Sequence, residues 1–328
     1  MHLIDTLRNK IGVLDDGDYM HGLQAVLLHI ETAGRHLTRG QESDDETAFT
    51  DAIYRTNQAF EGSVKEAYRV LAGKNPDKER PYDIELYLES NNIFRSRVMN
   101  QLAIYRKEWR NPSIHDYKLD FDESESFLAI VTVSAFACLL LDQIAEKLSF
   151  MRAQLATQAM ISPTNMASEQ PSVMPLLEQV LDYLSMFCES TAITRSAMKK
   201  NTGAQAIGAI HGFLATVAPD LKIETEKDVV FGIRFRSDMV ISNGDEVVVV
   251  EIRTQLRGDR LIGAVVQMED TLSAGGMMKG IIVVLPETPG AMERLNAHTY
   301  LPNGELVALI PHGSSSTLQG RLRFAPRP

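Results

Sequence analysis

Residues 236–253 read RSDMVISNGDEVVVVEIR, and this stretch decides how the second half of the chain folds. The Asn-Gly dipeptide at 243–244 is a strong hairpin-turn signal, and it lies between two apolar runs of strand type. Side chains alternate along a strand, so we expect Glu251 and Arg253 on one face, with Asp238 on the neighbouring strand. A charged pair directly after four valines is costly in a central strand unless it serves a site or lies at an exposed end.

Helical and strand-type segments alternate around this hairpin. The predicted helices are 174–187, 204–217 and 257–272, and the predicted strands are 221–225, 229–235, 239–241, 246–252 and 280–285. The last of these strands, GIIVVL, is continuously apolar, as expected for a buried central strand. Weaker strand signals follow at 306–310 and 322–324. We therefore expect a mixed-sheet α/β domain over residues 175–328.

The first half of the chain has apolar residues at helical spacing instead. The predicted helices are 23–37, 44–71, 93–109 and 125–155, with a short turn or helix at 84–88. Asn111-Pro112 is expected to stop the third of these helices, because proline disfavours helical geometry in the residue before it. Ser124 is the expected cap of the last helix. We predict an all-helical bundle over residues 1–155 and a linker at 156–174, where small, polar and proline residues gather.

Composition narrows the classes of function. The N-terminus has no signal-peptide core, and the longest apolar run, 127–141, is too short to span a bilayer. Cys138 and Cys188 are far apart and lie in apolar runs, which favours free thiols in a reducing compartment. We expect a soluble cytoplasmic protein with no membrane partner. The net charge of −10 argues against nucleic-acid binding by bulk charge, so any such contact needs a local patch, a composite site or a metal.

A first group of polar candidate residues lies between two predicted helices: Arg110, Asn111, His115 and Tyr117. An arginine can hold a phosphate through its planar fork, and a histidine can move a proton near neutral pH. Together they can cleave RNA without a metal, with histidine acting on the 2′-hydroxyl or leaving oxygen and arginine stabilising the transition state. The alternative is a capping arginine and a surface histidine in a turn.

This R-x4-H-x-Y motif, in its all-helical context, resembles the HEPN family over about residues 20 to 152. The resemblance implies a metal-independent endoribonuclease without a cofactor, in which Arg110 and His115 are catalytic and Asn111 supports the site. It also implies a homodimer that brings two motifs into one cleft. The form with tyrosine resembles HEPN toxins whose antitoxin partner modifies the matching residue, here Tyr117. Glu61 and Asp116 are further polar candidates, more simply explained as solvated carboxylates.

Asp238 and Glu251 form a second constellation with Arg253. Two carboxylates and a nearby cation suit Mg²⁺-assisted phosphodiester hydrolysis. The spacing D-x12-E-x-R, inside a helix–strand–strand–strand–helix–strand order, resembles the PD-(D/E)XK restriction-endonuclease-like superfamily over residues 176–286. The resemblance implies that Asp238 and Glu251 bind the metal and that Gln267 lies near the site.

Arg253 departs from the lysine of that superfamily, and arginine has a different geometry. The alternatives are a lysine supplied from elsewhere, a domain that only binds, or a simple strand-end salt bridge between Glu251 and Arg253. The lysines considered for this role are Lys222, Lys227 and Lys279.

The sequence thus predicts a HEPN-type endoribonuclease with an appended restriction-endonuclease-like domain. Such a pairing suits a prokaryotic toxin or anti-phage defence effector with RNA as its substrate. One alternative is a Mg²⁺-dependent DNA nuclease with a helical dimerisation domain. The other is a non-catalytic nucleic-acid-binding regulator.

Overall fold

The computed structural model describes residues 2–43, 45–116, 118–160, 174–190, 202–229, 235–254, 258–297, 300–314 and 324–326. The chain divides into two compact units, Met1–Lys147 and Leu148–Pro328. The first unit is helical and the second combines a mixed sheet with helices, so the predicted multidomain α plus α/β layout is confirmed.

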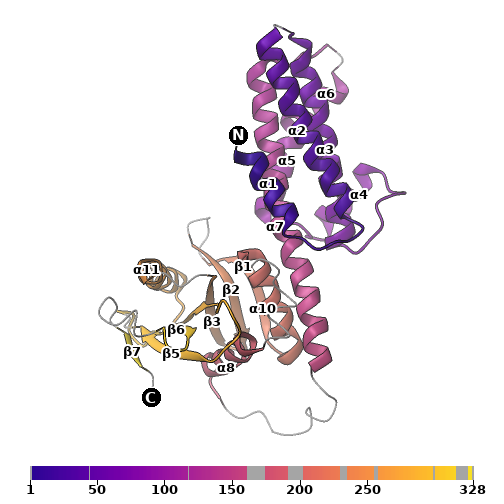
Figure 1. Cartoon of the computed structure of the whole chain (residues 1–328). Helices are drawn as coiled ribbons and strands as arrows, with labels where there is room; N and C mark the ends of the chain where they lie inside the picture. Colours follow the sequence, from indigo (N-terminus) through magenta and orange to yellow (C-terminus); the bar gives the residue numbers. More distant parts are fainter. Residues whose placement is uncertain are drawn as a thin grey trace. The chain divides into compact units, whose positions relative to one another are not determined.

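The N-terminal unit is helical, and its long helices α2 (Met20–Ser43), α3 (Thr47–Leu71) and α7 (Glu123–Met160) run side by side, with shorter helices beside them (Figure 1). In chain order, its described helices are α1 (His2–Gly12), α2, α3, α4 (Pro81–Ser90), α5 (Ser96–Tyr105), the π-helical segment η1 (Arg106–Arg110), α6 (Asn111–His115) and most of α7. Aromatic rings join three of them, because Phe60 of α3 stacks on Tyr105 of α5 and contacts Phe136 of α7, with ring centroids 4.8 and 5.3 Å apart. Helix α1 was not predicted.

Helix α7 begins with a reciprocal cap. Asp122 Oδ1 accepts a hydrogen bond from the Glu125 backbone N–H at 2.8 Å, and Glu125 Oε2 accepts one from the Asp122 N–H at 3.0 Å. Asp122 therefore caps the helix, and the prediction of Ser124 was wrong. The helix also continues to Met160, into the segment predicted as a linker, whose residues 161–173 lie outside the described part of the chain.

By length and composition, α7 could cross a membrane, but half of its most apolar window is buried within the protein. Burial of this kind is also found in the central helix of a soluble bundle. The run 127–141 that appeared too short for a span is thus part of a much longer helix.

The predicted stop at Asn111-Pro112 was wrong, because the chain stays helical to His115. The Asn111 N–H donates to the carbonyl of Arg106, five residues back, which closes a π-helical turn. Pro112 then falls in the first turn of α6, directly after this π-helical turn. A π-helical turn is often found at a functional site.

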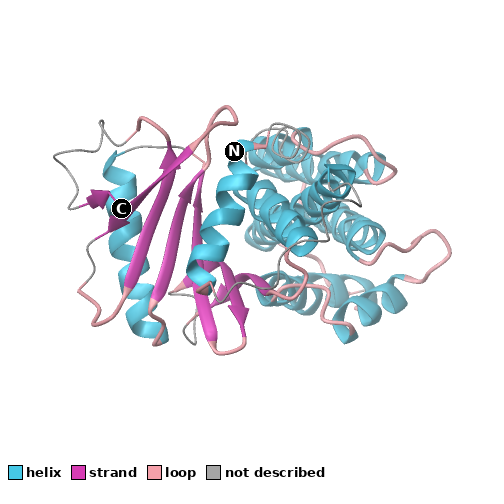
Figure 2. Cartoon of the chain, turned by 90° about the horizontal axis from the view of Figure 1, so that it is seen from below, coloured by secondary structure: helices cyan, strands magenta, loops and turns pink. Residues whose placement is uncertain are grey.

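The C-terminal unit carries its described strands in one seven-stranded sheet (Figure 2). The strands are β1 (Lys222–Asp228), β2 (Arg236–Asn243), β3 (Glu246–Arg253), β4 (Lys279–Val284), β5 (Met292–Ala297), β6 (Glu305–Pro311) and β7 (Phe324–Pro326). Their order is β1-β2-β3-β4-β6-β5-β7, so β4 is the predicted central strand. Strands β3, β4 and β6 run parallel, and the remaining neighbours are antiparallel.

Helices cover both faces of this sheet. Helices α8 (Leu176–Glu189) and α10 (Gly203–Val217) pack on the face that carries Val248 and Val250 of β3. Helix α11 (Gly258–Gly275) packs on the other face, against Val249. Because successive side chains of β3 point to opposite faces of the sheet, Glu251 and Arg253 lie on the α11 side, while Ile252 faces α8 and α10.

Most of the predicted elements of this unit are confirmed, and two differ. Gly244 has a φ of +57° in the predicted hairpin turn between β2 and β3. The strand predicted at 229–235 falls mainly on residues 230–234, which lie outside the described part of the chain, while β1 itself ends at Asp228. Strand β5 was not predicted.

Candidate functional site

Asp238 and Glu251 lie opposite each other on β2 and β3. Met239 pairs with Val250 in the antiparallel register, so the next pair outward is Asp238 with Glu251, and both side chains share one face. The Ile252 backbone N–H donates to Asp238 Oδ2 at 2.7 Å. The hairpin thus brings together the two carboxylates that the sequence singled out.

The electrostatics of this pair are unusual for surface carboxylates. Burial, and then the charge of Glu251, raise the pKa of Asp238 to about 7. Burial also raises the pKa of Glu251, although Arg253 opposes the change. With a pKa near 7, the Asp238 carboxyl keeps its proton well above the pH at which an exposed aspartate loses it. Such perturbed groups concentrate at functional sites.

Arg253 lies beside this pair, as the alternation of β3 predicts. Its Nη1 donates to Glu251 Oε1 at 2.5 Å, and 29% of its side chain is exposed. The strand-end salt bridge considered from the sequence is therefore present. The guanidinium is also accessible enough to contact an anion beside the carboxylates.

The three lysines considered from the sequence make contacts elsewhere. Lys227 donates to Glu224 at 2.6 Å, and it lies opposite Ser237, whose side chain is on the other face from Asp238. Lys222 also pairs with Glu224, at 3.5 Å. Lys279 pairs with Glu246, opposite Val248, at the far end of β3. Gln267 is exposed on α11, away from the helix face that packs on the sheet.

The carboxylates fit a hard divalent cation such as Mg²⁺, which prefers oxygen ligands and keeps several waters. Within the described ranges, no three His, Cys, Asp or Glu side chains are arranged to hold a metal ion together. A cation at Asp238 and Glu251 would therefore take its other ligands from water and from a phosphate.

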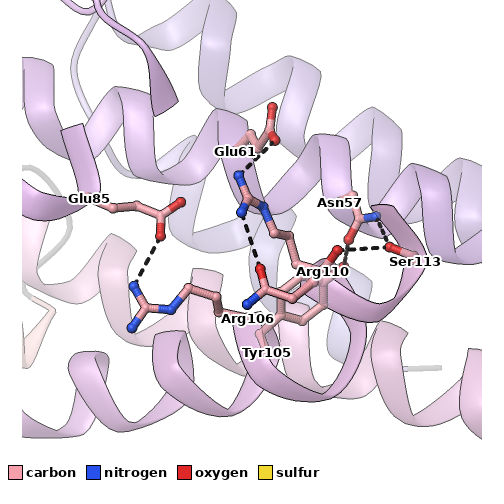
Figure 3. Close-up of polar contacts among 8 residues, drawn as sticks. Asn57, Glu61, Glu85, Tyr105, Arg106, Arg110 and Ser113 are labelled. Atoms are coloured by element: carbon pink, nitrogen blue, oxygen red, sulfur yellow. Dashed lines mark hydrogen bonds and ion pairs between the residues drawn. The ribbon is translucent and has the colours of Figure 1, made fainter. Parts of the chain in front are cut away.

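Arg110 lies in a polar cluster between α3 and the η1–α6 segment (Figure 3). Its Nη1 donates to Asn111 Oδ1 at 3.2 Å, and its Nη2 is 3.9 Å from Glu61 Oε1. Its Nε is buried without a hydrogen-bond partner among the described residues. Burial raises the pKa of nearby Glu85, against the attraction of Arg110 and then Arg106. The arginine is thus held among carboxylates.

A buried hydrogen-bond network fixes the backbone beneath Arg110. Asn57 Nδ2 donates to Ser113 Oγ at 2.8 Å, and Ser113 Oγ donates to the Arg110 carbonyl at 3.1 Å. The Tyr105 hydroxyl lies 2.9 Å from Asn57 Oδ1 and 2.7 Å from Thr56 Oγ1. These contacts tie the motif to α3 (Figure 3).

His115 is not brought beside Arg110 in one copy of the chain. His115 is exposed at the end of α6, whereas Arg110 is directed toward Glu61. His115 is five positions after Arg110 along the helix, which turns their side chains about 140° apart around the helix axis. Tyr117 lies outside the described residues, and Asp116 is exposed.

Two residues of the C-terminal unit were missed as site candidates. Glu226 and Arg236 flank Asp238, on β1 and β2 respectively, and Arg236 Nη1 lies 4.0 Å from Glu226 Oε2. Arg236 could have been noticed, because it is two residues before Asp238 and shares its face. Glu226 had no comparable signal, since the sequence does not fix the pairing of β1 with β2.

Comparisons of the chain with protein-family models, with curated proteins and with solved structures found no match. What the two sites can do is therefore inferred from their own residues.

Proposed function

We propose that the chain hydrolyses phosphodiester bonds at Asp238 and Glu251 with a divalent cation such as Mg²⁺. The observation that carries this proposal is the opposition of the two carboxylates on one face of the β2–β3 hairpin, where burial raises the pKa of both and the charge of Glu251 raises that of Asp238 further. A sheet has no packing reason to place two such acids together. A cation that neutralises them removes the cost.

Each residue has a chemical task in this proposal. Hydrolysis joins a water oxygen to phosphorus and breaks the bond to the leaving oxygen. A bound cation would supply charge stabilisation at the phosphate. Asp238 and Glu251 would hold it through their oxygens, with release of the proton that Asp238 retains near neutral pH. Arg253, which contacts Glu251, would donate to a phosphate oxygen and stabilise negative charge there.

The element order supports a restriction-endonuclease-like core for this unit. Helix α10 precedes the antiparallel strands β1, β2 and β3, then α11 crosses over to β4, which is parallel to β3. The carboxylates lie on β2 and β3, the positions at which that superfamily carries them. Nucleic acid, either DNA or RNA, is the substrate class that follows.

The test is a cleavage assay with the full chain on DNA and RNA, with Mg²⁺ or with EDTA. We expect cleavage that EDTA abolishes and that Glu251→Gln and Asp238→Asn each reduce at least about 100-fold, since each removes a charge that holds the cation. Asp220→Asn, which changes an exposed carboxylate, is the matched control. If neither EDTA nor either site variant reduces the cleavage of DNA or of RNA, the proposal is refuted.

A second candidate function is metal-independent RNA cleavage at Arg110 and His115, by resemblance to HEPN ribonucleases. It is favoured by the partly buried guanidinium of Arg110, whose Nε has no hydrogen-bond partner among the described residues. Because His115 lies on a different side of the helix, this activity requires a homodimer in which another copy completes the cleft. A toxin or anti-phage role, with an antitoxin or regulatory partner, belongs to this candidate.

EDTA separates the two candidates on RNA. Cleavage through Arg110 and His115 should persist in EDTA, and His115→Ala should reduce it by about 100-fold or more, the typical contribution of a placed proton donor or acceptor. Loss of all RNA cleavage in EDTA would exclude this second activity. Glu251→Gln is the control, since it should not affect the metal-independent reaction.

A further inference from the structure

Strand β1 carries a third carboxylate, Glu226, level with Asp238 and Glu251 on the two neighbouring strands. Thr225 pairs with Met239 and Lys227 pairs with Ser237, so Glu226 lies opposite Asp238. Asp238 lies in turn opposite Glu251. Three acidic residues therefore follow one line across three adjacent strands.

Glu226 makes a long ion pair with Arg236. Arg236 shares a face of β2 with Asp238, and its Nη1 lies 4.0 Å from Glu226 Oε2. The φ of Glu226 is +46°, a left-handed conformation that is uncommon for a residue other than glycine and that disturbs the regular alternation of β1. Glu226 is also close enough to raise the pKa of Asp238, after the larger effects of burial and of Glu251.

The ion pair with Arg236 does not by itself explain this position. Arg236 has a closer partner in Asp228, whose Oδ1 lies 3.0 Å from its Nε. Asp228 lies opposite Arg236. It is two residues along β1 from Glu226, and so it is not level with Asp238 and Glu251. The chain thus offers two carboxylates that contact the same arginine, of which one adjoins the pair.

We propose that Glu226 is a positioning residue of the cation site, which acts on the cation through a water molecule rather than as a direct ligand. The inference rests on the proposed function of Asp238 and Glu251. Direct coordination by all three is not what the described side chains offer. Mg²⁺ retains several waters in protein sites, and carboxylates that accept hydrogen bonds from such ligands strengthen binding.

The test is calorimetric titration of the full chain with Mg²⁺ at pH 8, without nucleic acid. Glu226→Gln removes the charge with little change in size, and we expect about tenfold weaker binding, at the lower end of the effect of such outer residues. Asp228→Asn, which removes the closer partner of Arg236, should change the affinity by less than twofold. Glu226→Asn is a second variant, because asparagine tolerates the left-handed conformation well.

The variants distinguish a failure of the cation site at Asp238 and Glu251 from a failure of the role proposed for Glu226. Glu251→Gln should abolish measurable binding, and if it does not, the proposed cation site fails and this inference fails with it. If Glu251→Gln abolishes binding but both Glu226 variants bind Mg²⁺ as the unchanged chain does, only the role of Glu226 is refuted. An equal loss in Asp228→Asn would also refute it, since Glu226 would then act only through its ion pair with Arg236.

Discussion

Asp238 on β2 and Glu251 on β3 face each other across an antiparallel pair of strands, and the Ile252 N–H donates to Asp238 Oδ2 between them. The hairpin turn at 243–246 fixes this opposition, because Asn243 pairs with Glu246, the register runs unbroken to Met239 and Val250, and the two acids are the next residues outward. The two acids are therefore held together by the backbone and not by a flexible side-chain contact. This fixed geometry keeps the charge of Glu251 close to Asp238, where it adds to the effect of burial on the pKa of Asp238.

The first prediction concerns the pH dependence of stability. The pKa of Asp238 is about 7 in the folded protein, above its ordinary value of 3.8. Well below pH 3.8 the carboxyl is protonated in both the folded and the unfolded state. From pH 4 to 7 it ionises only in the unfolded chain, so the free energy of unfolding falls as pH rises. Asp238→Asn should remove this loss and raise the free energy of unfolding of the C-terminal unit by about 2 to 4 kcal/mol at pH 8.

Urea denaturation at pH 4 and pH 8 measures this effect, with the transition of each unit followed separately. The increase in the free energy of unfolding caused by Asp238→Asn should nearly vanish at pH 4, where the Asp238 carboxyl of the folded protein is neutral. Asp220→Asn serves as the control at an exposed position. A lower free energy of unfolding of Asp238→Asn at pH 8 would show that the ionised Asp238 carboxylate does not destabilise the folded protein.

A second prediction concerns the start of α7. Asp122→Ala removes the side-chain oxygen that accepts the Glu125 N–H, and it should lower the free energy of unfolding of the N-terminal unit by about 1 kcal/mol. Ser124→Ala should change it by less than about 0.5 kcal/mol, as is usual for an exposed site. Thermal or urea unfolding followed by circular dichroism distinguishes the two variants, and the reverse ranking would contradict the capping geometry.

A third prediction concerns the network beneath Arg110. Asn57→Ala leaves the Ser113 hydroxyl and the Tyr105 hydroxyl each without one buried partner. The free energy of unfolding of the N-terminal unit should fall by about 1 to 3 kcal/mol. Asn91→Ala, at an exposed helix end, is the matched control and should have little effect. An equal effect of the two substitutions would mean that the network contributes nothing specific.

The acid pair could be predicted from the sequence because its geometry follows from a short turn. The Asn-Gly signal fixes the register of β2 with β3, and counting outward reaches Asp238 and Glu251. No such signal fixes the pairing of β1 with β2. The position of Glu226 opposite Asp238 therefore became visible only in the tertiary structure. Strand β5 was missed for a related reason, since its sequence, MERLNA, lacks a regular apolar alternation.

The surroundings of Arg110 could not be predicted from local sequence. Proline at 112 indicated a helix end, but the π-helical turn before it shifts the hydrogen bonding so that the helix continues. The contacts of Arg110 with Glu61, and of Ser113 with Asn57, join segments far apart in the chain. Motif spacing alone therefore did not reveal that Arg110 and His115 point in different directions.

Proton release on Mg²⁺ binding tests the central claim most directly. At pH 6.5 the pair at Asp238 and Glu251 retains most of one proton, because the pKa of Asp238 is about 7. Calorimetry in buffers of different ionisation enthalpy should therefore show up to one proton released for each Mg²⁺ bound, falling toward zero at pH 9. Binding and release should both be lost in Glu251→Gln. Absence of Mg²⁺ binding to the unchanged chain, or identical binding by Glu251→Gln, would contradict the assignment of this pair as a cation site.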